Sequence, residues 1–282
     1  MNALEVNGLT KIYPRFTLDN VSFEVTEGHV AGLIGRNGAG KSTTLKGMLR
    51  LISASGDVMV FGKSTETDEF AVKQVIGYVG GGFRYYPLKT VAAVSKTVSS
   101  FYDGFDNEKY CTYLDKFGID EKKKVRELSE GMKVKFALAL AISHGAKLLI
   151  MDEPTSGLDP LSREEFCDIV LELVKSEGVS VLFSTHITSD LMRIADDIIY
   201  ISNGKIIENA PLADVLDMYA LAHFHSESDA RKACAIGVKS VKGGFDGLVA
   251  KGAKIENGAV SDATLDDIMI HLETERGNAN AQ

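Results

Sequence analysis

The chain has 282 residues, of which 45% are apolar, and its 31 basic residues against 39 acidic ones leave a net charge of −8. This composition supports a packed core in one large domain, or in one domain with an appendage, and excludes disorder over most of the chain. The acidic surplus argues against a non-specific binder of nucleic acid or of anionic lipid, because both need a basic field, although it leaves room for a local basic patch.

The cysteines and the hydropathy of the chain indicate in which cellular compartment the protein is found. Cys111, Cys167 and Cys234 form no CxxC pair, so neither a disulfide framework nor a zinc site is predicted, and a reducing compartment is favoured. The longest uncharged stretch, residues 178–189, is far shorter than the ~20 apolar residues of a spanning helix. Residues 1–5 lack the features of a signal peptide. We therefore expect a cytoplasmic chain that needs a partner to cross a membrane.

The first element with a clear boundary is a strand followed by a helix. Residues 30–34 are an apolar run short enough for a buried strand, and a glycine-rich turn follows them. A helix is predicted over residues 41–52, where apolar side chains recur with helical spacing at Leu45, Met48, Leu49 and Ile52.

Two further buried strands are predicted at residues 148–151 and 179–183, where apolar runs end at polar clusters. Between them, residues 162–165 form a candidate capping box that would start a helix. The order strand, helix, strand indicates a βαβ unit in an α/β fold.

The main domain is expected to close near a hairpin. Residues 198–207 carry Asn203-Gly204 between two apolar segments, which is a strong hairpin signal. Beyond this point the sequence becomes polar and then rich in glycine and lysine. We therefore place the main domain at 1–218 and a small C-terminal module at 219–282.

Within the C-terminal module the clearest predicted element is a helix over residues 264–273, which Thr264 can cap. His223-Phe224-His225 is interpreted as a surface helix or loop rather than a metal site, because no acid or cysteine stands at ligand spacing.

Residues 35–42 fit the phosphate-loop pattern G-x-x-x-x-G-K-[ST] at every defined position, between the predicted strand and helix. The glycines would let backbone N–H groups turn inward around phosphates, Lys41 would reach the β- and γ-phosphates, and Ser42 would bind Mg²⁺. The alternative is a glycine-rich turn that binds nothing.

A Mg²⁺-nucleotide site also needs a carboxylate at the end of a neighbouring strand. Asp152 supplies it directly after residues 148–151 and is the metal-ligand candidate. Glu153 follows at once and is placed to act as the general base on a water molecule. The alternative for Glu153 is a solvated acid at a strand end.

Three further motifs complete a pattern: Leu128-Ser129-Glu130-Gly131-Met132, Ser156-Gly157-Leu158-Asp159 and Ser184-Thr185-His186. With the phosphate loop and Asp152-Glu153, they resemble in content and order the nucleotide-binding subunits of ATP-binding cassette (ABC) transporters, over residues 1 to about 218. The signature form and the C-terminal extension are similar to those of ABC-2-type exporter ATPases. The resemblance implies a P-loop NTPase (RecA-like) α/β core with an antiparallel β subdomain, a helical subdomain at about 85–145, and a small C-terminal α+β extension.

The resemblance also implies roles for individual residues in binding ATP and Mg²⁺. Tyr13 would stack on the adenine, and Ser42 and Asp152 would hold the metal. Lys41, Glu153 and His186 would be catalytic. The phosphates would be held by the loop residues Gly35, Asn37, Gly38, Ala39, Gly40, Lys41, Ser42 and Thr43.

Three residues are implied to act across a dimer. Ser129 and Gly131 would contact the γ-phosphate bound by the opposite subunit, and Asp159 would link the two sites. Taken alone, Ser129 and Gly131 mark only a helix start, Tyr13 a half-buried strand residue, and His186 a satisfied core histidine.

The sequence departs from the family pattern in two places. Gly81 stands where the family has a glutamine, which puts the hydrolysis rate and the coupling geometry in question. Phe83, Tyr85, Tyr86 and Pro87 are expected to keep a docking role toward a membrane subunit. In the signature, Glu130 replaces a glycine and Met132 a glutamine, and the Glu130 side chain is expected to point away from the nucleotide.

The function expected from these observations is that of an ATPase subunit of an exporter, peripheral on the inner face of the cell membrane. It would form a dimer with an identical or paralogous nucleotide-binding subunit and would drive an integral membrane permease subunit, without nucleic acid as a partner. The rivals are an importer subunit and a cassette without transport, such as a regulatory or DNA-maintenance ATPase or a translation factor. The transported substrate is not encoded here.

Overall fold

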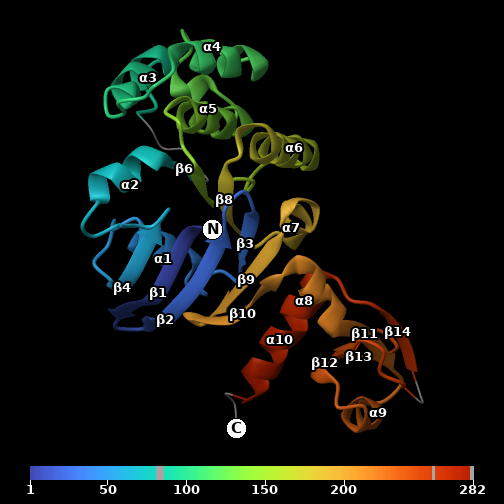
Figure 1. Ribbon diagram of the computed structural model, residues 1–282. Coiled ribbons are helices and arrows are strands. Elements are labelled where there is room, and N and C mark those ends of the chain that lie inside the picture. The colour runs from blue at the N-terminus through green and yellow to red at the C-terminus, as the bar shows by residue number, and fades with distance from the viewer. Residues whose placement is uncertain (81–85, 256–257, 280–282) are drawn as a thin grey trace. The chain divides into compact units, whose positions relative to one another are not determined.

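The computed structural model describes residues 1–80, 86–255 and 258–279 (Figure 1). The chain divides into two compact units, Met1–Asn209 and Ala210–Gln282. This division falls before helix α8 (Leu212–Met218), whereas the sequence places the boundary at 218/219. The difference arises because α8 contacts strand β11 (Tyr219–Phe224) of the second unit.

The first unit contains an antiparallel sheet in the order β2-β1-β4-β5. Its long strands are β1 (Asn2–Tyr13) and β2 (Phe16–Thr26), which pair over their whole lengths; β4 (Ser55–Val60) and β5 (Lys63–Ser64) complete it. Apolar residues alternate along β2, so that one face of this sheet is buried.

The second sheet of this unit has six strands in the order β10-β9-β3-β8-β7-β6. The strands β3, β6, β7, β8 and β9 run parallel, and β3 lies between β8 and β9. The bounds are β3 (Val30–Ile34), β6 (Ile76–Gly80), β7 (Leu148–Asp152), β8 (Ser180–Thr185), β9 (Asp197–Ser202) and β10 (Lys205–Pro211). The predicted buried strands are thereby confirmed, and the fold is the expected P-loop α/β fold.

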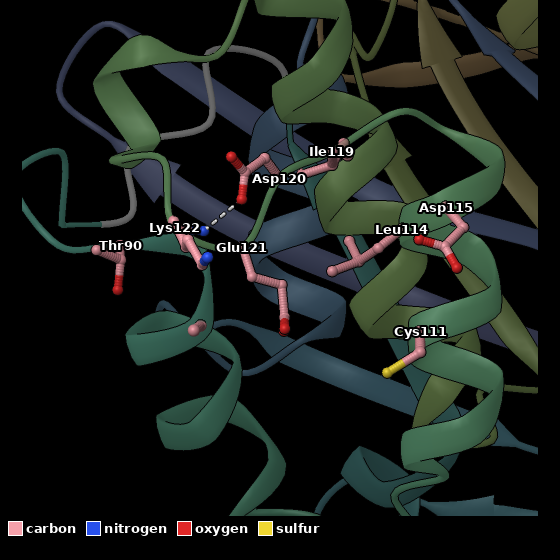
Figure 2. A pocket seen from close by; sticks show the side chains of 9 residues that line it. Thr90, Cys111, Leu114, Asp115, Ile119, Asp120, Glu121 and Lys122 are labelled. Atoms are coloured by element: carbon pink, nitrogen blue, oxygen red, sulfur yellow. Dashed lines mark hydrogen bonds between the residues drawn. The ribbon is translucent and has the colours of Figure 1, made fainter.

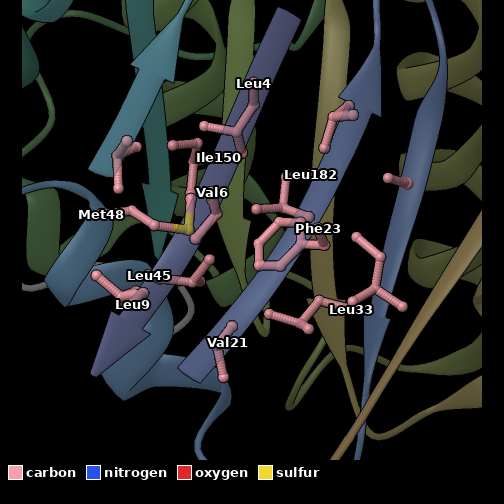
Figure 3. Packing of buried hydrophobic residues seen from close by; sticks show 14 of the residues in the cluster. Leu4, Val6, Leu9, Val21, Phe23, Leu33, Leu45, Met48, Ile150 and Leu182 are labelled. Atoms are coloured by element: carbon pink, nitrogen blue, oxygen red, sulfur yellow. The ribbon is translucent and has the colours of Figure 1, made fainter. Parts of the chain in front are cut away.

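The main core lies between the two sheets and around helix α1 (Lys41–Met48). Figure 3 shows Val6 and Phe23 of the antiparallel sheet packed near Leu45 and Met48 of α1 and near Ile150 of β7. Because this core fixes α1 against both sheets, it also fixes the β3–α1 loop at the end of the parallel strands.

Helix α2 (Glu69–Val75) directly precedes β6 in the chain. Between β6 and β7, helices form a separate part of the first unit: α3 (Val91–Ser99), α4 (Asn107–Lys116) and α5 (Glu130–Ser143), with a short 3₁₀ turn at Val125–Glu127. Thr90 caps α3 and Asp106 caps α4 through side-chain oxygens. Helix α5 packs against α3, α4 and β6 and joins this part to the sheet.

Two predicted helix boundaries are wrong. Helix α1 ends at Met48, four residues before the predicted end, because Arg50 has a left-handed φ of 54°. Helix α6 (Pro160–Glu177) begins before the predicted capping box, because Asp159 accepts hydrogen bonds from the amides of Leu161 and Ser162, both at 3.1 Å. Proline suits the first helical position, since its missing N–H would find no partner in the helix there.

The predicted hairpin is confirmed between β9 and β10. Asn203 and Gly204 have φ angles of 47° and 77°, as a tight hairpin turn requires. The remaining helix of this unit, α7 (Thr188–Ile194), lies between β8 and β9 in the sequence and packs on α6.

The second unit is a four-stranded antiparallel sheet in the order β12-β13-β11-β14, with two further helices. The elements are β11, α9 (Glu227–Lys232), β12 (Ile236–Val241), β13 (Gly244–Ala250), β14 (Gly258–Asp262) and α10 (Leu265–Ala279). Thr264 caps α10 as predicted, accepting from the Asp267 amide at 3.2 Å. This is the small α+β extension that the resemblance implied.

The interpretation of His223-Phe224-His225 as a helix or loop is wrong. His223 and Phe224 end strand β11, Phe224 is fully buried in the core of this unit, and His223 Nδ1 lies 2.6 Å from the Asp246 carboxylate across the sheet. Alternation along the strand places one residue inward and its neighbour outward. Within the described residues, no helix combines the length and the apolar character needed to cross a bilayer.

The turn glycine at position 204 generates a test of the fold. A Cβ at Gly204 would collide with the Thr17 carbonyl oxygen, whereas Gly178 at the end of α6 has a similar φ of 65° and open space around it. Gly204→Ala should lower the free energy of unfolding by about 3 kcal/mol, against about 1–2 kcal/mol for the control Gly178→Ala. Urea unfolding of both variants measures this, and equal losses would contradict it.

Candidate functional site

A cleft of about 740 Å³ lies at the carboxyl ends of the parallel strands of the first unit. Its walls come from the β1–β2 hairpin, the β3–α1 loop, the segments after β7 and β8, and the β9–β10 turn. The lining residues are Tyr13, Arg15, Phe16, Arg36, Asn37, Gly38, Gly40, Lys41, Ser42, Thr43, Glu153, Ser156, His186 and Asn203. The fold thus brings the predicted phosphate loop, Tyr13, Glu153 and His186 to one place.

The β3–α1 loop has the backbone that a phosphate loop needs. Gly38 and Gly40 have φ angles of 84° and 118°, which side chains other than glycine rarely adopt. A Cβ at Gly35 would collide with the Ile201 carbonyl oxygen. Gly40 is the N-cap of α1 and offers no side-chain cap, so the first amides of the helix stay available for an anion in the cleft.

Lys41 is held at the floor of the cleft, with only 6% of its side chain exposed. Its ammonium donates to the Gly35 carbonyl at 2.7 Å and lies 3.3 Å from the Glu153 carboxylate. A buried cation needs such partners because its desolvation is costly. The charge is therefore fixed between the loop and the end of β7.

Oxygen donors from three elements meet next to this lysine. The hydroxyls of Ser42 and Ser184 both donate to Asp152 Oδ1, at 3.2 and 3.3 Å. A hydroxyl and a carboxylate in contact form an oxygen-rich pair of the kind that Mg²⁺ prefers, with waters and phosphates as further ligands. Among the described residues there is no cluster of three or more His, Cys, Asp or Glu that could hold a metal by protein ligands alone.

Glu153 connects Lys41 to His186. One carboxylate oxygen faces Lys41, and the other lies 2.7 Å from His186 Nδ1. The Glu153 backbone adopts a left-handed φ of 51°, and its amide donates to the Ser184 carbonyl. Strained backbone of this kind clusters at functional sites, where the surrounding structure holds it in place.

Tyr13 lies at the cleft rim with 39% of its surface exposed and with the Lys11 ammonium 5.4 Å from its ring centre. Five lining residues had no role assigned from the sequence: Arg15, Phe16, Arg36, Ser156 and Asn203. The last three lie within predicted motifs, namely the phosphate loop, the segment 156–159 and the hairpin turn. The β1–β2 hairpin, in which Tyr13 pairs with Phe16, explains the first two, and a Pro-Arg pair directly after Tyr13 was the available signal.

The residues predicted to act across a dimer do not line this cleft. Ser129 caps α5 by accepting from the Met132 amide at 3.2 Å, and Gly131 lies in the first turn of that helix, near Leu158. The Glu130 carboxylate pairs with Lys133 of its own helix.

Asp159 caps α6 and is also outside the cleft lining. The hydroxyl and the amide of Ser162 donate to this carboxylate and hold its pKa below the usual value.

Gly81, which stands at the position of the family's glutamine, lies outside the described residues, as do Phe83 and Tyr85 of the predicted docking segment. Tyr86 and Pro87 are described and exposed, and the Pro87 carbonyl accepts from the Arg126 amide at 3.1 Å. A second cavity of about 550 Å³ lies among α3, α4 and the loop after α4, lined by Cys111, Asp120 and Glu121 among others (Figure 2). None of the predicted site residues lines it.

Comparison with known proteins identifies the family. The sequence profile described as ABC transporter matches residues 18–156. The chain is 32% identical over 265 residues to the uncharacterized ABC transporter ATP-binding protein YhcH of Bacillus subtilis, covering 91% of this chain and 86% of that protein. It is 36% identical over 210 residues to the lantibiotic transport ATP-binding protein SrtF of Streptococcus pyogenes, covering 72% and 89%.

A solved structure described as an ATP-binding subunit of an ABC transporter superposes with a TM-score of 0.68 at 28% identity, covering 76% of this chain and 91% of that one. From the motifs, the fold and these relatives, the chain belongs to the ATP-binding subunits of ABC transporters and is an ATPase.

Proposed function

We propose that this subunit forms a dimer around two Mg-ATP and that hydrolysis at Glu153 drives export through a separate permease on the inner face of the cell membrane. The observation that carries the proposal is the chain of contacts from Lys41 through Glu153 to His186 beside the Ser42–Asp152 pair. A nucleotide-binding protein without hydrolysis has no need of a carboxylate held between a cation and an imidazole.

The cleft supports a specific orientation of ATP. Tyr13 stacks on the adenine at the open rim, and the glycine loop with the first amides of α1 binds the phosphates at the closed end. Ser42 and Asp152 hold Mg²⁺, which neutralises charge on the phosphate oxygens when bound. Lys41 adds its positive charge at the floor.

Glu153 acts as the general base. Its carboxylate takes a proton from the attacking water, the water oxygen bonds to the γ-phosphorus, and the bond to the β–γ bridging oxygen breaks to leave ADP and phosphate. The contact at Nδ1 fixes the orientation of the His186 ring, so that the other ring nitrogen is free to meet the γ-phosphate.

A dimer explains the residues that do not line the cleft. Ser129 and Gly131 sit at the exposed start of α5, where amides suit an anion supplied from another molecule. Asp159 lies at an exposed helix start with a carboxylate already oriented by Ser162. The proposed partner is a second copy or a paralogue, related by a two-fold arrangement.

Two observations favour export as the direction of transport. The name of SrtF describes lantibiotic transport, and the LSEGM signature together with the C-terminal unit favours an exporter over an importer. The exposed Tyr86 and Pro87 form part of the proposed contact with the permease. A cassette without transport would need no such surface.

The base assignment predicts the behaviour of Glu153→Gln. ATP turnover should fall by about 10²–10⁴-fold, because an amide cannot accept the proton from water. The variant should also elute as an ATP-dependent dimer in gel filtration, since the bound nucleotide is no longer consumed. The exposed Glu108→Gln is the control; turnover of Glu153→Gln at the wild-type rate would refute the assignment.

The stacking assignment predicts a split between two Tyr13 variants. Tyr13→Ala should weaken ATP binding by about 1–3 kcal/mol, because the base loses its aromatic contact, whereas Tyr13→Phe should bind as the wild type does. Equilibrium binding of a fluorescent ATP analogue measures both. Equal affinity of Tyr13→Ala and the wild type would show that Tyr13 is only a half-buried strand residue.

The docking assignment is tested by assembly. Tyr86→Glu should reduce co-purification with the membrane permease subunit of the proposed transporter, while ATP binding stays unchanged, because the residue is 68% exposed and does not line the cleft. The exposed Phe70→Glu on α2 is a comparison with the same change in charge. Full assembly of Tyr86→Glu would remove this surface from the proposed contact.

A further inference from the structure

A polar cluster surrounds one buried carboxylate of the first unit, and none of its members lines the cleft. It consists of Thr155, Arg163, Ser189 and Asp190, and we call it the Asp190 cluster. The Thr155 hydroxyl donates to one Asp190 oxygen at 2.7 Å. The Arg163 guanidinium donates to the other oxygen from two nitrogens, at 2.6 and 3.2 Å, and to the Ser189 hydroxyl at 3.0 Å.

The centre of the cluster is buried, since Thr155 is 0% exposed and Asp190 is 5% exposed. The Arg163 side chain is 22% exposed, and Ser189 lies at the exposed edge. Burial raises the pKa of the neighbouring Cys167 thiol to about 12, and the Asp190 charge adds to this effect. A buried carboxylate whose two oxygens are both satisfied holds its partners in one geometry, and removal of a partner leaves a costly unpaired group.

Each member of the cluster lies close in sequence to a residue of the proposed site. Thr155 is two residues after Glu153, and Asp190 is four residues after His186. Arg163 is four residues after Asp159, one helical turn along α6. Three segments that carry site residues are therefore joined through one carboxylate.

The covalent paths between the cluster and the site are short and ordered. The Thr155 carbonyl accepts from the Leu158 amide, and the Ser156 amide donates to the Glu153 carbonyl, so this loop is a closed turn. Asp190 lies in the first turn of α7, whose N-cap Ile187 has no side-chain cap. An acid at that position also interacts favourably with the helix dipole.

We propose that Asp190 is a positioning residue, which through Thr155 and Arg163 fixes the distance between Glu153 and His186 and couples it to the start of α6. This inference rests on the proposed roles of Glu153 and His186. It predicts a loss of turnover without a loss of ATP affinity. The reason is that the hydrogen bonds of the cluster do not involve the phosphate loop, Lys41 or Tyr13, which are the groups proposed to bind ATP.

The test compares variants of this cluster with a matched ion pair between the same two helices. Thr155→Val keeps the shape and removes the hydroxyl, Thr155→Ser restores the hydroxyl, and Asp190→Asn removes the charge. The control is Asp168→Asn, which breaks an exposed contact from α6 to Arg193 of α7 at 2.8 Å. Steady-state ATP turnover of the full chain gives kcat and KM for each variant, with thermal unfolding recorded in parallel.

Thr155→Val should lower kcat about tenfold or more with KM for ATP within twofold, and Thr155→Ser should recover the wild-type kcat. Asp190→Asn should lose at least as much as Thr155→Val, and Asp168→Asn should stay within twofold. Wild-type kcat in folded Thr155→Val and Asp190→Asn would overturn the inference. So would a rise in KM that accounts for the whole loss.

A second measurement does not depend on turnover. In ¹⁵N-histidine spectra, with the His186 signals assigned through His186→Gln, Thr155→Val should shift the ring signals of His186 and Asp168→Asn should not. Unshifted His186 signals in Thr155→Val would overturn the inference even if the variant is less stable. Glu153→Gln in the same turnover assay separates the two proposals. Wild-type activity of Glu153→Gln would refute the role of Glu153 as general base, and the positioning role of Asp190 would then be decided by the His186 signals.

Discussion

The close approach of the β3–α1 loop to the end of β9 is the constraint on which the rest of the site depends. Gly35 has no room for a side chain beside the Ile201 carbonyl, and the Ala39 carbonyl accepts from the Gly204 amide at 2.8 Å. The loop is thus supported from behind by the β9–β10 turn. With its backbone fixed in this way, the loop presents its amides to the cleft without reorganisation, which is what effective electrostatic stabilisation requires.

The charged side chains of the site depend on the position of this loop and on one another. Lys41 is buried only because the Gly35 carbonyl and the Glu153 carboxylate surround its ammonium. Glu153 in turn orients His186, while Asp152 is occupied by two serine hydroxyls from different elements. Each group is held by a partner on another strand or loop, so a displacement of one strand end would disturb several groups together. The Asp190 cluster adds a further link of this kind, because it joins the loop after β7 to helices α6 and α7.

The two units are held by different interactions. The first has a large core between two sheets, whereas the second has a small core around Phe224 and alanines, and a sheet whose edge strand β14 is exposed along its length. Polar contacts therefore contribute a larger share of the stability of the second unit. Examples are the pair of His223 with Asp246 and the contact of buried His271 with the Gly237 carbonyl. Of these histidines, His223 was interpreted as part of a surface helix or loop, whereas His271 lies within the predicted helix over residues 264–273.

The sequence by itself determined the elements with strong local signals, because those signals act over a few residues. The buried strand before the phosphate loop, the Asn203-Gly204 turn and the Thr264 cap follow from apolar runs, backbone conformation and capping chemistry. The order of the motifs was enough to identify the family. Local signals failed where two caps competed, since Asp159 with Pro160 displaced the capping box at residues 162–165.

Only the tertiary structure decided which distant side chains meet. Arg15 and Asn203 reach the cleft because two hairpins converge on it, and Thr155, Arg163 and Asp190 share one buried site because α6 and α7 pack together. No periodicity encodes such contacts, because they depend on the pairing order of parallel strands that are far apart in the chain. The physical reason is that burial and hydrogen-bond satisfaction are set by the whole fold, whereas helix caps and turns are set by their neighbours in sequence.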